Sequence, residues 1–418
     1  MKKMGSFLKA VAISSILVIS LFGQPCAQNL IHVGSYDSLS YAVAVALEGD
    51  SWDNNFAYVA DQGMGLAIFA VSDSANPYMV GLFHPSMGQW AFDIDVVGNT
   101  AYLAAGTSEP YMGTLYIVDV TDKQNPTQLG SISFSWEIVA VEVDGGYAYL
   151  ADASGMLKIV DVSNPANPVL IGSRGISAME LYKRDYLYAA CGFQGLKIVD
   201  VSVPADPQII GTCDTPWQAM GVTLREGRNS FAYVADGDSG LQIIDVREPS
   251  NPTIVGNLIT SDMATDIAAG RWFVYAALED SGIVSVAVSA PWKPWIVGWG
   301  DTPAIARGID VDLGVAVANG ESLEFFRIDL CSCAFIVGDI NGNGNANGVD
   351  VAYGVNYFKG FGPPPPYLCP CPPHGDIYVA GDVNGSCAFN GVDITYFVEC
   401  LVEDDQDLMP CPDCPPDY

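Results

Sequence analysis

A repeat with six clear copies constrains this chain more than any other feature. The segment Ala-Tyr-Val-Ala-Asp at residues 57–61 recurs five more times in varied form, each time with a tyrosine in second place. The six tyrosines, spaced 39 to 47 residues apart, are Tyr58, Tyr102, Tyr149, Tyr188, Tyr233 and Tyr275. A steady period of this length indicates an array of similar structural units, each too small to bury its own apolar face.

Each unit contains four short segments of strand character. A strand such as 91–96 precedes the tyrosine strand, and a glycine-containing turn, an apolar strand such as 156–161, a proline-bearing turn and a short strand ending in Val-Gly or Ile-Gly follow it. β-Branched and aromatic residues fill the strands, while Gly, Asn, Asp and Pro separate them. Four strands in every repeat predict the blades of an all-β propeller.

The two ends of the repeat region predict how the ring closes. The last unit has strand-like segments at 307–311, 314–318 and 323–328 but no fourth one. Leu30–Ser35, near the N-terminus, resembles the fourth strand of an earlier unit at 169–173. We therefore predict that the N-terminal strand completes the last blade, which removes open sheet edges. This gives seven four-stranded blades, with six as the alternative.

The repeat resembles a known family. Residues 158–162 and 197–201 both read Lys-Ile-Val-Asp-Val and precede serine- and proline-containing turns, in the manner of LVIVD repeats. The resemblance extends over residues 28–330 and implies a propeller in exported or cell-surface proteins. It implies no particular reaction.

The N-terminus has the pattern of an export signal over residues 1–27. Lys2, Lys3 and Lys9 flank an apolar run at 10–22 that is too short to span a bilayer, and cleavage is expected near Ala27. Lipidation at Cys26 is the alternative. No later segment predicts a transmembrane helix, so we expect a secreted or cell-surface protein.

Charge excludes one class of partner. The chain has 17 basic and 48 acidic residues, a formal net charge of −31, and no basic cluster after the first ten residues. Nucleic acids and anionic lipids are bound through Lys/Arg patches, so neither is an expected partner.

Two loops near the C-terminus have the spacing of calcium ligands. Oxygen donors at loop places one, three, five, seven, nine and twelve wrap one calcium ion, as in an EF-hand. In the first loop these are Asp339, Asn341, Asn343, Asn345 through its backbone carbonyl, Asn347 and Asp350. In the second they are Asp382, Asn384, Ser386, Ala388 through its carbonyl, Asn390 and Asp393.

The loops differ at place six, where the chain turns sharply. Gly344 suits this turn in the first loop, whereas Cys387 occupies it in the second and makes the second site weaker. A short apolar helix is predicted after each loop, at 351–358 and 394–401. Two asparagine-rich turns without metal are the alternative interpretation.

This duplicated pattern resembles type I dockerins over residues 331–402. The resemblance implies a small α/loop calcium-binding domain and a cohesin-like protein partner. Dockerins that bind cohesins usually have Ser or Thr at loop places ten and eleven, where this chain has Gly348-Val349 and Gly391-Val392. The sequence therefore supports calcium binding more strongly than cohesin binding.

Cysteines are concentrated in the same region. Eleven are present, and eight of them lie between Cys331 and Cys414, which in an exported protein predicts disulfides. A zinc site at the Cys-Pro-Asp-Cys segment 411–414 is the weaker alternative. Residues 403–418 form an acidic, proline-rich tail.

Carboxylates recur on the predicted first strands, nearest the ring axis. They could form a cation-binding or acid–base channel, or they could accept hydrogen bonds from the backbone of neighbouring blades. We favour the second interpretation because a ring of equivalent positions does not supply the specific pair that a glycosidase needs. These residues are Asp93, Asp95, Glu142, Glu180, Asp266 and Asp310.

Two further repeated features fall near the turns. Asp61, Asp152 and Asp236 follow the tyrosine strand, where aspartate commonly caps turn backbone. Trp90, Trp136 and Trp217 fall where first strands begin and are expected near one mouth of the ring. They are either a platform for sugar or peptide or aromatics that pack the repeat.

No catalytic constellation is recognisable in the sequence. Its three histidines, His32, His84 and His374, form no HExxH pattern, and neither a GxSxG elbow nor a P-loop occurs. The preferred interpretation is a non-catalytic binding protein with a protein or glycan partner and a calcium-dependent attachment domain. The alternative is an extracellular carbohydrate-active hydrolase or lyase that carries a dockerin tag.

Overall fold

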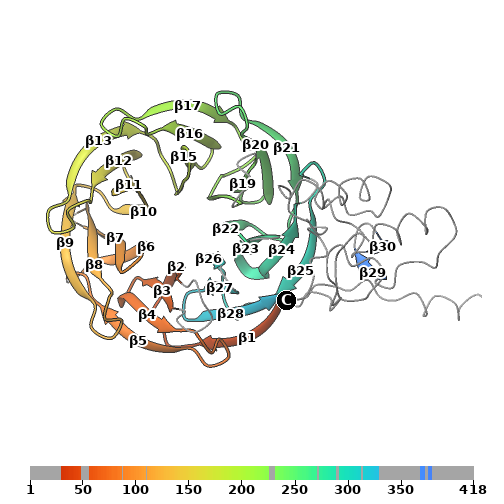
Figure 1. Ribbon diagram of the computed structural model, residues 1–418, viewed down its shortest axis with the longest axis horizontal. Helices are drawn as coiled ribbons and strands as arrows, with labels where there is room; N and C mark the ends of the chain where they lie inside the picture. The colour runs from red at the N-terminus through yellow and green to blue at the C-terminus, as the bar shows by residue number, and fades with distance from the viewer. Residues whose placement is uncertain are drawn as a thin grey trace, which may run out of the picture. The chain divides into compact units, whose positions relative to one another are not determined.

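Seven four-stranded antiparallel sheets surround a central axis in the computed structural model (Figure 1). This confirms the all-β propeller and the count of seven blades rather than six. The structure describes residues 30–48, 56–86, 88–109, 111–225, 231–270, 273–288, 291–311, 314–328, 368–371 and 375–378.

Within each blade the strands follow one another outward from the axis, so that the first strand is innermost. Blades one to three comprise β2 (Ala42–Glu48), β3 (Phe56–Asp61), β4 (Gly65–Ala70), β5 (Tyr78–Phe83); β6 (Trp90–Val97), β7 (Thr100–Ser108), β8 (Tyr111–Asp119), β9 (Thr127–Phe134); and β10 (Ile138–Asp144), β11 (Tyr147–Asp152), β12 (Met156–Asp161), β13 (Val169–Gly175). Blades four to six comprise β14 (Glu180–Lys183), β15 (Leu187–Ala190), β16 (Leu196–Asp200), β17 (Gln208–Cys213); β18 (Gly221–Leu224), β19 (Phe231–Ala235), β20 (Leu241–Asp245), β21 (Thr253–Leu258); and β22 (Ala264–Ala269), β23 (Phe273–Leu278), β24 (Gly282–Ala287), β25 (Trp295–Gly300). A 3₁₀ turn, η1 (Glu279–Ser281), joins β23 to β24.

The seventh blade is built from both ends of the propeller. It comprises β26 (Gly308–Val311), β27 (Val315–Ala318), β28 (Leu323–Ile328) and, as its outermost strand, β1 (Leu30–Tyr36). β1 pairs antiparallel with β28 from Leu30 opposite Ile328 to Tyr36 opposite Leu323. The predicted closure by the N-terminal strand is therefore confirmed.

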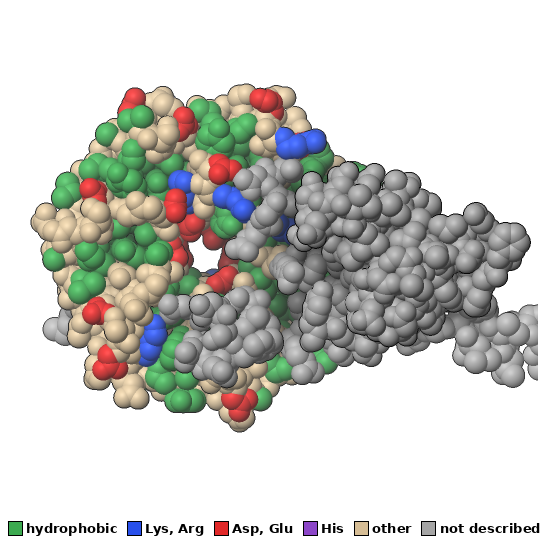
Figure 2. Space-filling view, in the orientation of Figure 1, with side chains coloured by type: hydrophobic (Ala, Val, Ile, Leu, Met, Phe, Trp, Pro, Cys, Tyr) green, Lys and Arg blue, Asp and Glu red, His purple; other side chains and the backbone are tan. Residues whose placement is uncertain are grey.

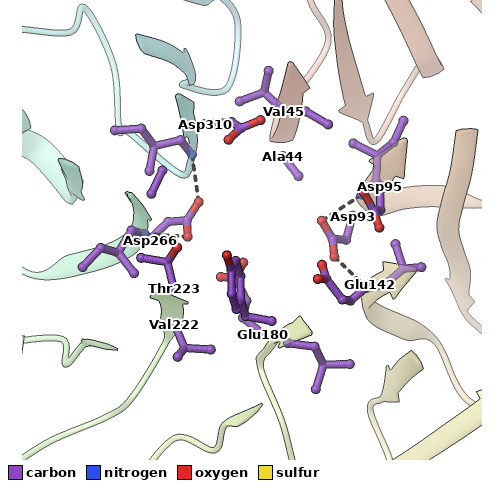
Figure 3. Close-up of a pocket in the computed structure, with 18 of the residues that line it drawn as sticks. Ala44, Val45, Asp93, Asp95, Glu142, Glu180, Val222, Thr223, Asp266 and Asp310 are labelled. Atoms are coloured by element: carbon purple, nitrogen blue, oxygen red, sulfur yellow. Dashed lines mark hydrogen bonds between the residues drawn. The ribbon is translucent and has the colours of Figure 1, made fainter. Parts of the chain in front are cut away.

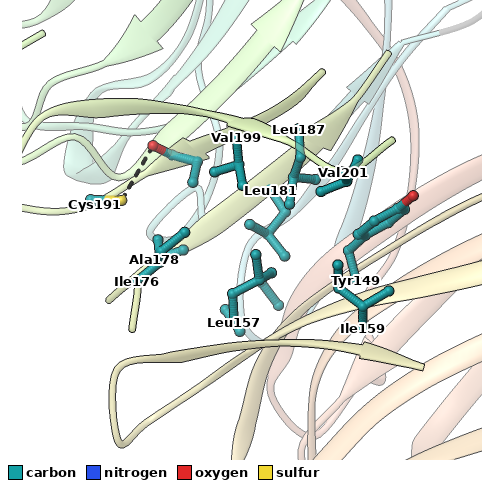
Figure 4. Packing of buried hydrophobic residues seen from close by; sticks show 13 residues of the cluster. Tyr149, Leu157, Ile159, Ile176, Ala178, Leu181, Leu187, Cys191, Val199 and Val201 are labelled. Atoms are coloured by element: carbon teal, nitrogen blue, oxygen red, sulfur yellow. Dashed lines mark hydrogen bonds between the residues drawn. The ribbon is translucent and has the colours of Figure 1, made fainter. Parts of the chain in front are cut away.

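The hydrophobic core lies between successive blades. Between blades three and four, Tyr149 and Ile159 of one sheet pack with Leu181, Leu187 and other buried side chains of the next (Figure 4). The repeated tyrosines are all buried, with exposed fractions of 7% or less. Burial of both faces of each blade explains the nearly continuous apolar runs of the second and third strands.

A glycine in each fourth strand allows the next blade to pack closely. A Cβ atom on Gly172 of β13 would lie 2.0 Å from the carbonyl oxygen of Pro204, which belongs to the proline-bearing turn of the next blade. A Cβ atom on Gly34 of β1 would likewise lie 2.2 Å from the carbonyl oxygen of Ser74 in blade one. The glycine that follows Val, Ile or Leu in these fourth strands is thus a packing requirement, and β1 meets it at the ring seam.

Little of the predicted C-terminal domain lies within the described residues. A two-stranded hairpin of β29 (Leu368–Cys371) and β30 (Gly375–Tyr378) is described there. The calcium-ligand positions between 339 and 393, the two predicted helices and the signal segment lie outside the described residues. In the described part of the chain no helix is long and apolar enough to cross a membrane.

Two cysteines lie in the propeller and both are free. Cys191 and Cys213 are buried. The side chains of the eight cysteines from Cys331 onward lie outside the described part of the chain, so the predicted disulfides remain a prediction.

Candidate functional site

All six predicted carboxylates face the central channel of the propeller. They lie on the innermost strands β6, β10, β14, β22 and β26 and line a cavity of about 200 Å³ (Figure 3). Acidic side chains gather around the central opening (Figure 2). The first strands therefore bring together the acidic residues that the sequence placed nearest the axis.

Most of these carboxylates link one blade to the next. The carboxylate of Asp93 accepts hydrogen bonds from the backbone N–H of Ile94 in its own strand (2.8 Å) and of Val141 in the next blade (2.7 Å). Asp95 likewise accepts from Val96 (2.7 Å) and from Val143 (2.6 Å). Each carboxylate thus satisfies backbone donors on inner strands that have no further strand to pair with.

The same link recurs around the ring. Glu142 accepts from the Lys183 N–H, Asp266 from the Ile309 N–H and Asp310 from the Leu47 N–H, each at 2.8 Å. Five of the six carboxylates therefore hold the backbone of a neighbouring blade. This confirms the interpretation of the carboxylates as inter-blade acceptors for these five residues.

Glu180 is the exception and makes a longer connection. Its carboxyl group faces that of Asp266, which lies two blades further around the ring, and the nearby carboxyl group of Asp266 raises the pKa of Glu180 (Figure 3). The intervening blade has Gly221 in the facing position, and a Cβ there would lie 3.0 Å from Asp266 Oδ1. Two carboxyl groups that lie this close disfavour each other's ionised form.

The channel environment favours the protonated carboxylic acids. Each side chain keeps some surface that channel water can reach, but protein surrounds it closely enough to remove most of its bulk hydration. Burial raises the pKa of Asp93 and Asp310 to about 7 and that of Asp95 to about 6, against the lowering effect of the backbone hydrogen bonds. Burial also raises the pKa values of Glu142, Glu180 and Asp266, and nearby carboxylates raise those of Glu142 and Glu180 further.

A pattern of small residues, not predicted from the sequence, accompanies these acids. At the level of Asp93, Glu180 and Asp266, the blades between them carry Ala44, Ala140, Gly221 and Gly308. These positions are equivalent because each one pairs, in the second strand of its blade, with an alanine in the same register. Asp93 pairs with Ala104, Glu180 with Ala190 and Asp266 with Ala277. Aligning the first strands by this register would have shown that acidic and small residues alternate around most of the ring.

The repeated aspartates after the tyrosine strand cap turns, as predicted. Asp61 is fully buried, and its carboxylate accepts hydrogen bonds from the backbone N–H groups of Ser40, Tyr41, Gly63 and Met64, at 2.7 to 2.8 Å. Asp152 accepts from backbone donors of its own turn, and Asp236 accepts from the Trp217 N–H. These residues are structural and are not available to a ligand.

One face of the propeller, which we call the aromatic face, is formed by two kinds of connection. Because strands alternate in direction, the connections between blades and those between second and third strands emerge on the same side. Their described residues fall at 37–41, 62–64, 84–86, 88–89, 109, 135–137, 153–155, 176–179, 191–195, 214–220, 236–240, 259–263, 279–281, 301–307 and 319–322. The channel opens at its centre, and the three predicted tryptophans lie on or beside it.

Two of these tryptophans form exposed aromatic pairs. Trp136 stacks on Tyr111 with ring centroids 5.0 Å apart, and Trp217 meets Phe193 edge to face at 5.9 Å. The exposed fractions are 41% for both tryptophans, 51% for Tyr111 and 70% for Phe193. In each pair, one ring lies where the third strand begins and the other lies in the connection to the next blade. Tyr111 and Trp136 hold these places in blade two, and Phe193 and Trp217 hold them in blade four. The aromatics therefore pack on each other and leave much of their surface open.

The family comparison agrees with the fold. Residues 43–84, 89–133, 139–174, 183–215 and 218–260 match the model of the LVIVD repeat. The protein therefore carries LVIVD repeats and folds as a seven-bladed β-propeller. No curated protein matches the sequence.

Solved structures of similar shape are distant in sequence. The chain is similar to a chain of the mitotic checkpoint complex (TM-score 0.55, 14% identity) and to the Pan2 WD40 domain of Neurospora crassa (TM-score 0.55, 11% identity). Each alignment covers 72% of this chain. It also covers 96% of the checkpoint-complex chain and 95% of the Pan2 domain. The computationally designed Ika8 protein aligns over 72% of this chain and 100% of its own, with a TM-score of 0.51 and 9% identity. At these identities the similarity concerns the fold alone.

Proposed function

We propose that this chain is a non-catalytic interaction protein whose partner binds the aromatic face of the propeller. The observation that carries the proposal is the pair of exposed aromatic contacts, Tyr111–Trp136 and Phe193–Trp217, at equivalent places in two blades. Aromatic residues are enriched at protein interfaces because they offer large, rigid contact area at low entropic cost. Trp90 and Met179, exposed by 46% and 47%, extend the apolar surface of this face.

The state of the channel carboxylates also favours binding over catalysis. Glycosidases position two carboxyl groups roughly 5 to 9.5 Å apart on either side of the scissile bond. Here every channel carboxylate except Glu180 holds a backbone N–H group of a neighbouring blade. A substrate would have to displace contacts that join the blades.

The aromatic face can be tested by binding measurements on the full chain. We expect a protein or glycan ligand, found by pull-down or on a glycan array, to lose affinity at least about tenfold in Trp136→Ala and Trp217→Ala, because buried aromatic anchors dominate interface energies. Tyr78→Ala and Trp292→Ala are matched controls, since these exposed residues (61% and 74%) belong to the opposite face. Equal losses in both sets, or turnover of a bound glycan, would contradict the proposal.

The flanking segments complete the proposed role. We infer from residues 1–27 that the protein is exported, and from residues 331–402 that a dockerin-like domain binds Ca²⁺ and attaches the propeller to a larger assembly. The support for both comes from the sequence motifs described above.

Calcium binding can be measured directly by calorimetry on the full chain. Each loop supplies only two carboxylates, so the dissociation constant is expected in the range of roughly 10⁻⁴–10⁻³ M. Asp339→Ala or Asp350→Ala should remove most of the calcium heat, because Gly344 lets the first loop turn without strain. Asp382→Ala should remove less, because Cys387 weakens the second loop. A calorimetric trace without calcium heat in the unmodified chain would refute the assignment.

A further inference from the structure

The aromatic face is strongly acidic. In its described connections, exposed acidic residues occur in several blades, among them Glu109, Asp214, Asp238 and Asp280. The single Lys or Arg in those same described connections is Arg307, and its guanidinium already stacks on Tyr41, 4.9 Å from the ring centroid. The described connections of this face therefore combine negative charge with aromatic rings, and the lysines that reach them from neighbouring strands, Lys158 and Lys197, contact Asp152 and Gln194.

The opposite face has a different character. Its described turns carry basic residues together with acidic ones, including Lys123, Arg184, Arg247 and Lys293. Some of these basic side chains are paired internally, as in the bidentate contact of Arg247 with Asp245. The first and last described strand residues of the propeller, Leu30 and Ile328, also pair at this side. Among the described residues, negative charge and exposed aromatic pairs thus coincide on the aromatic face.

A pocket lies on the aromatic face at the ring seam, and we call it the seam pocket. It has a volume of about 420 Å³ and is lined by His32, Asp37, Asp301, Glu321, Ser322 and Glu324, among others. Its volume lies within the range of roughly 300–1,000 Å³ that is usual for ligand pockets. Four of the lining side chains named here are carboxylates, contributed by β28 and by three different connections.

The base of the seam pocket is held in place by a buried network. Glu324 is 1% exposed, and its carboxylate contacts His32 Nε2 at 2.5 Å and accepts a hydrogen bond from the Ser322 hydroxyl at 2.5 Å. Asp37, Asp301 and Glu321 are exposed at the rim. The rim acids can therefore meet a ligand while the buried network fixes the shape of the pocket.

This arrangement suits an organic cation better than a metal ion. Among the described residues no group of three or more His, Cys, Asp or Glu side chains is close enough to hold a metal. Carboxylates spread around a pocket of this size can instead pair with a planar guanidinium, which donates several hydrogen bonds in fixed directions. Arginine also stacks on aromatic rings, as Arg307 does here on Tyr41.

We propose that the aromatic face binds a basic polypeptide segment, with one arginine side chain of the partner in the seam pocket and residues further along the segment over an exposed aromatic pair. This inference rests on the proposed interaction function and names the chemistry of the partner. Charge complementarity between a cationic segment and this face also speeds association and disfavours anionic competitors.

The experiment uses the full chain and a short arginine-containing peptide labelled with a fluorophore. The comparison peptide has each arginine replaced by citrulline, which keeps the shape and lacks the charge. We expect the arginine peptide to bind at least about tenfold more tightly, since two or three charge-assisted hydrogen bonds are lost on replacement. The triple variant Asp37→Asn, Asp301→Asn, Glu321→Gln should lose this preference.

A matched triple variant on the opposite face controls for net charge. Asp122→Asn, Asp206→Asn and Glu248→Gln remove the same number of exposed charges there and should leave the preference intact. Equal weakening by both triple variants would overturn the proposal, because attraction would then come from total charge alone. Melting curves establish that both variants are folded.

Two other outcomes separate this inference from the proposed function. If both peptides bind equally and Trp136→Ala weakens both, the aromatic face binds polypeptides without selecting cations, and the inference fails while the proposed function stands. If neither peptide binds but a neutral glycan binds with the same tryptophan dependence, the partner class is wrong. Binding that ignores both Trp136 and the seam pocket contradicts the proposed function as well.

Discussion

Lowering the pH from about 8 to about 5 should raise the melting temperature of the propeller. The channel carboxyls have folded-state pKa values raised to about 7 for Asp93 and Asp310 and about 6 for Asp95, chiefly by burial. In the unfolded chain the same groups titrate near 4. Between these values the folded protein binds more protons than the unfolded chain, so stability falls as pH rises through this window.

The size of the effect is set by the number of retained protons. Each proton held only by the folded state contributes about 1.4 kcal/mol per pH unit as an upper limit. Water in the channel screens these groups, and their mutual coupling spreads the titration over a wider range. Below about pH 4 the trend should reverse, because turn carboxylates such as Asp161 and Asp200 have lowered pKa values and lose their hydrogen-bonded charge there.

The variant Glu180→Gln isolates the carboxyl pair from the general effect of net charge. A glutamine amide can donate permanently to Asp266, so this variant should melt higher than the unmodified protein at about pH 8 and show a weaker pH dependence. Asp206→Asn removes one exposed charge elsewhere and should leave the slope unchanged. A melting temperature that is highest near pH 8 in the unmodified protein would show that the channel acids are ionised in the folded state.

Removal of Leu30–Ser35 should destabilise the propeller severely. These residues form most of β1, the outer strand of the seventh blade, and their loss exposes the edge of β28. It also removes His32, which contacts the buried carboxylate of Glu324, and Gly34, which packs against the backbone at Ser74. The deletion thus removes a whole strand of hydrogen bonds together with a side-chain partner of the buried Glu324 carboxylate.

We expect the melting temperature to fall by about 10 °C or more. Each kcal/mol of lost stability lowers the melting temperature of a domain of this size by a few degrees, so a fall of this size corresponds to the loss of several kcal/mol. Size-exclusion chromatography should also show association, because an exposed strand edge pairs with other chains. His32→Ala keeps the strand and removes only the side-chain contacts of His32 with Glu324 and Phe326, so its effect on the melting temperature should be smaller. A deletion variant that melts and elutes like the unmodified protein would mean that β1 contributes little to ring closure.

The sequence determined the architecture of the propeller almost completely. The tyrosine period specified the blades, because each blade must bury both faces against its neighbours and therefore repeats the same apolar pattern. The missing fourth strand of the last unit and its match at Leu30–Ser35 predicted the seam, which β1 and β28 confirm. The sequence also predicted that the repeated aspartates cap turns, which the hydrogen bonds to Asp61 from the turn backbone confirm.

Tertiary structure alone decided which side chains act together. The sequence placed Glu180 and Asp266 on first strands, but the approach of their carboxyl groups depends on the glycine of the intervening blade and on the width of the channel. The pairing of Tyr111 with Trp136 depends on two connections meeting on the same face. The seam pocket joins residues almost 300 positions apart, such as Asp37 and Glu324. A repeat period fixes how each blade folds, whereas such pairs depend on the curvature of the ring, which arises only when all seven blades pack.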